Sequence, residues 1–297
     1  MSNDTPLSRR AAIIEGFIVT VIWASSFVLV KIALKHMDPL TIAGSRYLLG
    51  FLFLLPIMVF NKKNQFNIPA KLWTRMVLIG ISAYLIGNGA NFWALKYIPA
   101  TTASLIMSFM PLVVLVASVV WLKELPTSWQ IIGVIISIIG SVLFFWEGLN
   151  PGEPVGLAIM LVGMIGFSLF GILSRETAHS WEMDTLPLTA FPLGIGGLLL
   201  LFIALPLEGL PSFNLQTWLV VLWLAVVNTS IAYVLYNHSL RAITALEMNV
   251  LLNLAPLETA LFAWILLGEG ISGVQILGMI VVVVGAFVVQ FTGKKAR

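Results

Sequence analysis

The chain has 297 residues, of which 59% are hydrophobic and only 10% are charged, and its formal net charge is +3 at pH 7. Soluble domains usually have about a quarter of their residues charged, so this composition excludes a soluble fold. The sequence contains no cysteine and three scattered histidines, which excludes disulfides and offers no metal-site spacing. No phosphate-binding Gly-Lys-Ser/Thr loop occurs either. We therefore expect an all-α membrane protein that is not an enzyme and uses no metal, cofactor or nucleic-acid partner.

Ten membrane-spanning helices are predicted, because apolar runs of about 20 residues, long enough to cross a bilayer core of ~30 Å, recur along the chain. In chain order they lie near residues 11–34, 39–60, 74–96, 100–122, 127–147, 155–174, 185–206, 215–239, 245–267 and 271–291. The first span follows Arg9 and Arg10, as a signal peptide would. Its length and the presence of Glu15 indicate an uncleaved first helix.

Lysine and arginine predict the orientation of these helices. With the N-terminus inside, the inner side would carry Arg9, Arg10, Lys62, Lys63, Lys71, Arg75, Lys123, Arg175, Arg241, Lys294, Lys295 and Arg297, and the outer side only Lys31, Lys35 and Lys96. Short cytoplasmic loops are enriched in basic residues. Both termini are therefore expected to face the cytoplasm, and the positive net charge is interpreted as an orientation signal.

An internal repeat relates the two halves of the chain. Shifted by 145 residues, the stretch 94–143 aligns with 239–288 without a gap, and the identical pairs include Pro111/Pro256, Glu124/Glu269, Gln130/Gln275, Gly133/Gly278 and Gly140/Gly285. The halves 11–147 and 155–291 would each hold five spans, and because five is odd the second half must be inverted relative to the first. Inverted repeats are typical of secondary transporters, which bind substrate between the halves near the membrane midplane.

Small residues at helical spacing predict where spans pack closely. Gly133, Ser137 and Ser141 lie on one face of the fifth predicted span, and Gly278 and Gly285 recur in the tenth. Close backbone approach through such residues drives helix association in lipid. We assign these residues to packing and give them no role in transport.

Polar side chains recur on one face of each of four predicted spans. The four sets are Tyr84, Asn88 and Asn91, their equivalents Thr229, Tyr233 and Tyr236, then Ser104, Ser108 and Pro111, and their equivalents Asn249, Asn253 and Pro256. Polar groups are costly in hydrocarbon unless they face a partner or a wet cavity. We expect these faces to line a central cavity, together with Trp23, Ser26 and Met107; hydrogen bonding between helices without a substrate is the alternative. The two prolines would each kink a span, which marks either a binding region or a packing kink.

Glu258 is the one carboxylate predicted to lie deep inside a span. Three roles are open for it: a proton-coupling site, a partner for a substrate ammonium group, or a hydrogen-bonded structural acid. Arg46 and Lys31 are candidate charge partners at similar depth, and snorkelling to the outer interface is the alternative for both. Glu124 and Glu269 lie in turns just before a span, where an acidic side chain complements the helix dipole.

Several segments resemble those of a known family. They are Trp23-Ala-Ser-Ser-Phe-Val in the first predicted span, Arg46-Tyr47 in the second, and the paired segments 122–133 and 267–278, which share Glu, Gln and Gly at matching positions. Over essentially its whole length the chain is similar to EamA-type members of the drug/metabolite transporter superfamily, in particular the YddG-type amino acid exporters of bacterial inner membranes. The resemblance implies ten spans in a basket arrangement, a central cavity, alternating access and export of amino acids, aromatic ones among them. The sixth span departs from the pattern of the first, so the halves need not contribute equally.

The predicted cavity combines amides and hydroxyls with aromatic rings and a methionine. It should bind zwitterions through hydrogen bonds and accept apolar side chains of varied shape. We expect phenylalanine, tryptophan, methionine and threonine to compete for one broad, weak site, with a binding free energy of roughly 4–6 kcal/mol. Another small cargo, such as a sugar, a nucleoside or a cationic drug, stays open, as does a membrane enzyme or channel. The expected partners are amino acids and the lipid bilayer of the bacterial inner membrane, and a monomer is compatible with this arrangement.

Overall fold

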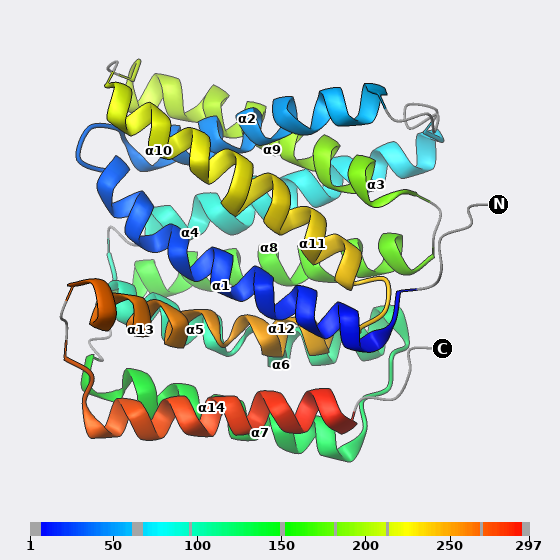
Figure 1. The fold of residues 1–297 in the computed structure, drawn as a ribbon, viewed down its shortest axis with the longest axis vertical. Coiled ribbons are helices and arrows are strands. Elements are labelled where there is room, and N and C mark those ends of the chain that lie inside the picture. Colours follow the sequence, from blue (N-terminus) through cyan, green and yellow to red (C-terminus); the bar gives the residue numbers. More distant parts are fainter. Residues whose placement is uncertain are drawn as a thin grey trace.

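A computed structural model of the protein describes residues 7–60, 68–94, 97–148, 152–180, 183–211, 214–267 and 270–292. All regular structure in these ranges is helical. The helices run side by side between two ends of the molecule, and the start of α1 and the end of α14 lie at the same end, on the right in Figure 1. We call this the terminal end and the opposite one the distal end.

The helical segments are bounded as follows. In chain order they are α1 (Arg9–Ala33), α2 (Pro39–Phe60), α3 (Ala70–Gly80), η1 (Ile81–Asn88), α4 (Gly89–Ala94), α5 (Ala100–Ser108), α6 (Met110–Ala117), η2 (Ser118–Leu122), α7 (Ser128–Phe145), η3 (Trp146–Gly148), α8 (Pro154–His179), α9 (Thr185–Glu208), α10 (Leu215–Ala225), η4 (Val226–Ile231), α11 (Ala232–Ser239), α12 (Ala245–Leu252), α13 (Ala255–Leu267) and α14 (Gly273–Thr292). The segments η1, η2 and η4 are π-helical and continue neighbouring α-helices, whereas η3 is a single 3₁₀ turn.

Eight helical stretches in the described residues are long and apolar enough to cross a membrane. They are Pro39–Phe60, Ala70–Asn91, Thr101–Leu122, Ser128–Gly148, Pro154–His179, Thr185–Glu208, Leu215–Ser239 and Gly273–Phe291. The other two predicted spans, 11–34 and 245–267, fall on α1 and on the pair α12 and α13. Large apolar side chains such as Val116, Phe202 and Ile265 are exposed on the outside of the bundle, as expected of a lipid-facing surface. The chain is thus a multi-pass, all-helical membrane protein.

Two helices are longer than the sequence predicts. α3 begins at Ala70 rather than near 74, and α8 ends at His179 rather than near 174. Both extensions carry charged side chains, which a prediction based on hydropathy assigns to loops. Within the added turn of α8, Glu176 forms an ion pair with Arg75 of α3, which holds this polar turn beside α3.

Two predicted spans are broken at equivalent places. α5 gives way to α6 at Phe109, and α12 gives way to α13 at Asn253 and Leu254. Each break lies just before a proline, Pro111 or Pro256, which has no backbone N–H to continue the helical hydrogen bonds. Where the sequence predicts a kink in a continuous helix, the structure therefore has two shorter helices that meet end to end.

The π-helical segments were not predicted. η1 and η4 begin 145 residues apart, so they occupy equivalent positions of the repeat. Side chains satisfy some of the carbonyl groups there: Asn88 Nδ2 donates to the carbonyl of Ala83 at 2.9 Å, and Ser230 Oγ donates to that of Ala225 at 2.8 Å. Single π-helical turns inside α-helices frequently occur at functional sites, which directs attention to the parts of the bundle that these two segments contact.

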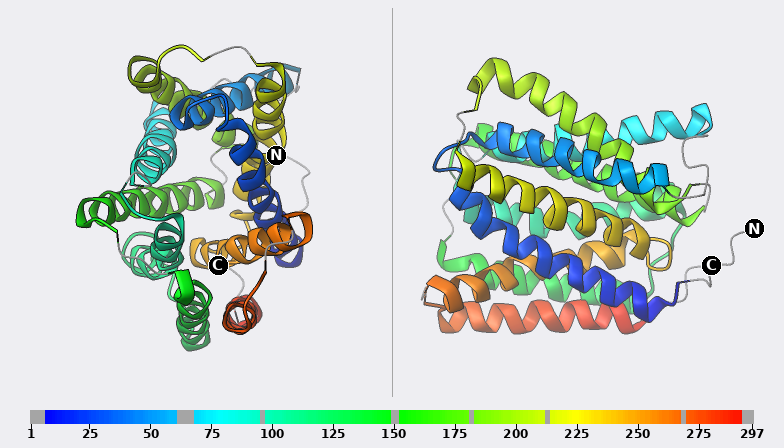
Figure 2. Two further views of the ribbon diagram at one scale, coloured as in Figure 1. Left: turned by 90° about the vertical axis from the view of Figure 1, so that its left-hand side faces the viewer. Right: turned by 45° about the horizontal axis from the view of Figure 1, so that its top comes forward.

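α7 and α14 pack side by side through the small residues that were predicted to form a seam (Figure 2). A Cβ atom added to Gly140 would lie 2.5 Å from the backbone nitrogen of Val282, and one added to Gly285 would lie 2.5 Å from that of Ser137. Because neither position has room for a side chain, the two backbones meet directly. α2 packs against α9 of the other half of the chain.

Candidate functional site

Six aromatic side chains meet in the interior of the bundle. They are Trp23 of α1, Tyr47 of α2, Tyr84 of η1, Phe170 of α8, and Tyr233 and Tyr236 of α11. The contacting rings have centroids between 4.5 Å (Tyr47 and Tyr84) and 6.5 Å (Tyr84 and Phe170) apart. We call these six residues the aromatic cluster; η1, one of the π-helical segments, contributes directly to it.

Most rings of the aromatic cluster are tilted or edge-on to one another. Phe170 and Tyr236 form the one stacked pair, with an interplanar angle of 16°, and Trp23 is tilted against both Tyr233 and Tyr236 at 5.1 and 5.7 Å. Such pairs contribute about 0.5–1.5 kcal/mol each beyond the burial of their area. Five of the six side chains are buried, whereas Trp23 is half-buried, so Trp23 is the ring of the cluster with the most exposed surface.

Hydrogen bonds fix Trp23 against the second half of the chain. The indole Nε1 donates to the carbonyl of Asn228 in η4 at 3.1 Å. The side-chain amide of Asn228, which is fully buried, donates in turn to Ser25 Oγ at 3.1 Å and to the carbonyl of Ile22. α1 and η4 therefore each donate hydrogen bonds to the other, and these bonds hold the Trp23 ring in one orientation.

The two charged residues predicted inside the membrane lie in different surroundings. Arg46 donates from Nε to Thr229 Oγ1 at 3.2 Å. Glu258, in the first turn of α13, accepts from Thr20 Oγ1 at 2.9 Å, and its second oxygen is buried without a hydrogen-bond partner in the described part of the chain. None of the described ion pairs joins Arg46 to Glu258. The side chain of Lys31 lies outside the described residues.

Four of the amides and hydroxyls that were predicted to line the cavity bind their own helices. Ser26, Asn88, Ser108 and Asn249 each donate to a backbone carbonyl three to five residues earlier. Ser and Asn side chains make such local bonds readily. Each of these side chains thus uses one donor within its own helix.

Asn253 connects the two broken spans. It lies at the break between α12 and α13, and its Nδ2 donates to the carbonyl of Ser108 at 3.1 Å and to Ser137 Oγ at 3.4 Å. The Ser108 carbonyl is at the end of α5, where carbonyl groups lack helical partners. The equivalent residues Ser108 and Asn253 therefore meet in a hydrogen bond between the two halves.

The structure divides the predicted cavity residues into two groups. Trp23, Tyr84, Tyr233 and Tyr236 meet in the aromatic cluster. Asn91 of α4 and Ser104 and Met107 of α5 are half-buried, and Met107 packs against an apolar group of side chains that includes Met110 and Met164. The tyrosines of the predicted faces are thus brought together with Trp23, whereas Met107 belongs to a separate apolar contact.

Three residues of the site were not predicted as such. Tyr47 directly follows Arg46, and Asn228 directly precedes Thr229, so a search of the neighbours of the predicted polar residues would have found both. Phe170 lies in the apolar run of α8 and carries no signal that separates it from the residues around it. Only its position in space identifies it.

A buried carboxylate holds three helices together at the terminal end. Glu247 of α12, 0% exposed, accepts two hydrogen bonds of 2.8 Å from Arg9 of α1, one of 3.0 Å from Gln130 of α7, and one of 2.9 Å from the amide of Thr244. The sequence singled out Glu258 as the one deep carboxylate, but Glu247 is the more deeply buried of the two. Thr244 and Glu247 form a capping box, a local pattern visible in the sequence.

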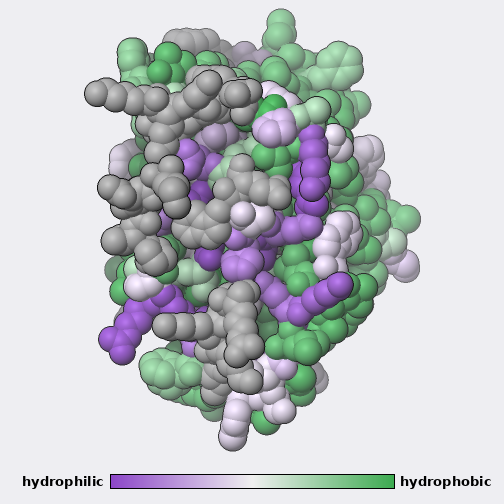
Figure 3. Space-filling model, turned by 90° about the vertical axis from the view of Figure 1, so that its right-hand side faces the viewer, coloured by the Kyte–Doolittle hydropathy of each residue, from purple (hydrophilic) through white to green (hydrophobic). Residues whose placement is uncertain are grey.

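Three further pairs of ionisable side chains lie at the terminal end. Arg175 Nε contacts Glu124 at 2.8 Å, Arg75 pairs with Glu176, and His238 Nδ1 lies 2.9 Å from Glu15. Each pair, like that of Arg9 with Glu247, joins a residue of the first half to one of the second. Figure 3 looks onto this end and shows hydrophilic side chains gathered near its middle.

Glu124 does not play the role expected from its place in the sequence. α7 begins with a capping box formed by Thr127 and Gln130, and the carboxylate of Glu124 pairs with Arg175, which is 1% exposed. A buried arginine near the turn competes more strongly for the carboxylate than a helix dipole does. Glu269, for which the same role was expected, lies outside the described residues.

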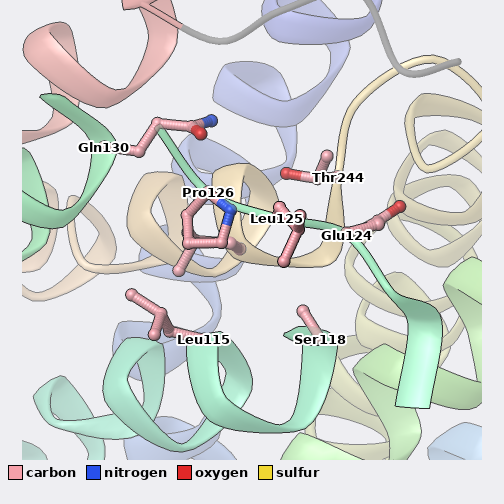
Figure 4. A pocket seen from close by; sticks show the side chains of 8 residues that line it. Leu115, Ser118, Glu124, Leu125, Pro126, Gln130 and Thr244 are labelled. Carbon is pink, nitrogen blue, oxygen red and sulfur yellow. The ribbon is translucent and has the colours of Figure 1, made fainter. Parts of the chain in front are cut away.

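A small cavity lies beside Glu124, between the loop before α7 and the start of α12 (Figure 4). It is lined by Leu115, Ser118, Glu124, Leu125, Pro126, Gln130, Thr244 and Leu246. Its volume of about 20 Å³ accommodates about one water molecule. It is too small for an amino acid. A larger, open hollow of about 580 Å³ lies on α6 and η2 and is lined by apolar side chains and Trp121. We take the aromatic cluster as the candidate site because it joins rings from both halves of the chain.

Comparisons with known proteins agree with a transport role. The model of the EamA-like transporter family matches residues 10–146 and again residues 154–291. An uncharacterized transporter of Archaeoglobus fulgidus is 27% identical over 271 residues, which cover 90% of this chain and 93% of that relative. A probable amino-acid metabolite efflux pump of Salmonella typhimurium is 26% identical, with 93% and 95% covered. An S-adenosylmethionine/S-adenosylhomocysteine transporter of Chlamydia muridarum is 26% identical, with 87% and 85% covered.

The fold is shared with a protein of known crystal structure. The two chains superimpose with a TM-score of 0.82 at 19% sequence identity, and the match covers 95% of this chain and 98% of the other. At this identity the likeness concerns the arrangement of the helices alone.

Proposed function

The chain belongs to the EamA-like transporter family, and because the proteins of this family are membrane transporters, we propose that this one exports amino acids across the bacterial inner membrane. The proposed cargo comprises aromatic and other neutral amino acids, such as phenylalanine, tryptophan, methionine and threonine. They would pass by alternating access through a central site between the two halves of the chain, as in the YddG-type exporters that the sequence resembles.

The aromatic cluster is the observation that carries this proposal. Three of its rings come from the first half of the chain and three from the second, namely Trp23, Tyr47 and Tyr84, and Phe170, Tyr233 and Tyr236. Aromatic rings offer a large apolar surface and, in tyrosine and tryptophan, a polar group that can bind a zwitterion. The Salmonella typhimurium relative named as a probable amino-acid metabolite efflux pump supports the same class of cargo.

The proposed architecture has ten spans arranged as two inverted repeats of five, over 11–147 and 155–291, with the terminal end in the cytoplasm. α1 and the pair α12 and α13 would supply the two spans beyond the eight that length and composition identify. The recurrence of both the π-helical segments and the helix breaks after 145 residues supports the repeat. The excess of lysine and arginine in the loops of the terminal side supports the orientation.

Alternating access requires contacts that can open on one side while the other stays closed. The four pairs of ionisable side chains that join the halves at the terminal end support a state that is closed on that side. At the distal end, Glu208 of α9 accepts hydrogen bonds of 3.1 and 2.8 Å from the amides of Leu40 and Thr41 at the start of α2. The hydroxyl of Thr41 also donates to Glu208 at 2.8 Å, so this contact would have to break when the distal side opens.

The proposal is tested by flux in reconstituted vesicles. Labelled phenylalanine is expected to exchange, and excess unlabelled methionine or threonine should lower its flux. Trp23→Ala should lower the flux roughly tenfold, because two ring contacts are lost. Trp129→Ala, which removes an exposed tryptophan on α7, is the matched control and should leave the flux unchanged. If no amino acid moves while a sugar or a nucleoside does, the proposed cargo is wrong.

Glu258 is proposed to couple transport to protons. It is half-buried, and the oxygen that has no partner among the described residues could hold a proton. Glu258→Gln keeps the shape of the side chain and the acceptor for Thr20 Oγ1. The variant is expected to exchange phenylalanine at the wild-type rate but to lose the acceleration that a pH gradient gives the wild type. If the flux of the variant still responds to the gradient, Glu258 does not couple transport to protons. It would then be a structural acid or a partner for a substrate ammonium group.

A second cargo is favoured by one observation. The Chlamydia muridarum relative is named as an S-adenosylmethionine/S-adenosylhomocysteine transporter, and aromatic rings attract a cation such as a sulfonium. Competition separates the two cargoes. S-adenosylmethionine should inhibit phenylalanine flux only weakly if neutral amino acids are the cargo, and at low concentration if it is itself transported.

A further inference from the structure

Arg46 points into the bundle from the middle of a membrane span. It lies within α2 and is half-buried. Its Nε donates to Thr229 of η4 at 3.2 Å, and its guanidinium carbon lies 5.0 Å from the centroid of the Tyr47 ring. Because Tyr47 belongs to the aromatic cluster and η4 to the other half of the chain, the guanidinium is directed toward the interior, and snorkelling to the outer interface does not describe it.

Arg46 differs from the half-buried Arg9 and the buried Arg175 in how its charge is balanced. Arg9 and Arg175 each lie 2.8 Å from a carboxylate, those of Glu247 and Glu124. For Arg46, the described residues supply no carboxylate within ion-pair distance. A cation inside a membrane protein is costly unless an anion or a wet cavity faces it. The interior therefore carries a positive charge that no described side chain neutralises.

The end of the Arg46 side chain is available to a ligand. Nε is occupied by Thr229, but neither terminal nitrogen has a hydrogen-bond partner among the described residues. Neither nitrogen belongs to the buried polar atoms that lack a partner, so each keeps some accessible surface. Two N–H groups side by side on a planar guanidinium match the two oxygens of a carboxylate.

We propose that Arg46 binds the carboxylate of the transported molecule, so that the substrate class is defined by a carboxylate next to an apolar or aromatic group. The inference rests on the proposed transport function and adds the residue that sets its specificity. From Tyr47 the rings of Tyr84 and Tyr233 follow at 4.5 and 5.5 Å, and Trp23 at a further 5.1 Å. A side chain attached to a carboxylate at Arg46 would thus contact the aromatic cluster. Sugars, nucleosides and simple amines lack the anion and would bind far more weakly.

Competition with matched ligands tests this role. Phenylalanine, 3-phenylpropionate, phenylalaninamide and phenethylamine share one ring and differ in the carboxylate and the amine. Against labelled phenylalanine flux through the wild type, the amide and the amine should compete at least tenfold more weakly than phenylalanine. Arg46→Gln should weaken binding of phenylalanine roughly 10- to 100-fold, as expected for the loss of a charged hydrogen-bonding pair, and should remove the difference between phenylalanine and its amide.

Two further variants separate the role of the charge from other effects. Arg46→Lys keeps the charge but not the paired N–H groups, so it should keep the preference for carboxylates with reduced affinity. Lys35→Gln removes an exposed cation and should leave competition unchanged. Because Arg46 takes part in no described ion pair, Arg46→Gln should fold, which its melting temperature in detergent will show.

A direct binding measurement keeps the inference apart from the proposed function. We expect 3-phenylpropionate to raise the melting temperature of the purified protein and phenethylamine to leave it unchanged. This difference reports the carboxylate preference even if no amino acid is transported. Flux without this preference would support amino acid transport and overturn the role of Arg46. Equal competition by phenylalanine and phenylalaninamide in the wild type, or a preference that survives in Arg46→Gln, would also overturn it.

Discussion

Replacing Glu247 by alanine is expected to lower the free energy of unfolding by about 3–5 kcal/mol, the usual cost of removing one partner of a buried ion pair. The carboxylate is 0% exposed and accepts four hydrogen bonds, from Arg9, Gln130 and Thr244. Its loss leaves the guanidinium of Arg9 without its anion and deprives Gln130 and the Thr244 amide of their acceptor. The result should appear as a lower melting temperature in detergent and as a lower yield of folded protein.

Matched controls exist for both partners of this ion pair. Glu153→Ala removes an exposed carboxylate that does not cap α8 through its side chain, and it should change the melting temperature little. For the arginine of the pair, Arg9→Ala should lower the melting temperature, whereas Arg10→Ala, at the exposed neighbouring position, should not. Equal effects of Glu247→Ala and Glu153→Ala would show that the buried pair contributes nothing to stability.

Replacing Gly140 by leucine should prevent α7 and α14 from packing. Even the first atom of a side chain would lie 2.5 Å from the backbone nitrogen of Val282 and 2.9 Å from the carbonyl of Gly278. Backbone cannot move aside as a flexible side chain can, so the helices must separate. Gly140→Ala is expected to cost about 1–3 kcal/mol, as overpacking does, and the leucine variant more, with little folded protein recovered after purification.

Gly273→Ala is the control for this seam. Gly273 begins α14, and an added Cβ there meets nothing within 4 Å in the described structure. Alanine is also the better helix former, so the melting temperature should stay the same or rise slightly. A Gly140→Ala protein as stable as the wild type would mean that the two helices can separate at no cost.

Most of the site could be named from the sequence because its residues are unusual for their surroundings. Tyr84, Tyr233, Arg46 and Glu258 are polar or charged inside apolar runs, and such residues in a membrane need a partner or a cavity. Phe170 could not be found in this way, since a phenylalanine in an apolar helix is what lipid itself would favour. The sequence alone also could not reveal that Asn88 and Asn249 each donate a hydrogen bond to a carbonyl of their own helix, and their place in a cavity stays a prediction.

The sequence by itself determined the membrane class, the positions of most helices, the small residues through which α7 and α14 pack, and the places where two prolines disturb a span. Each of these depends on a local property, such as the hydropathy of about 20 residues, the missing N–H of a proline, or the size of a glycine. Only the tertiary structure decided that Arg9 meets Glu247, 238 residues further along the chain, that π-helical segments interrupt the spans, and that Arg46 has no described carboxylate beside it. These features depend on which helices become neighbours and at what rotation, and hydropathy is the same for every rotation of a helix about its axis.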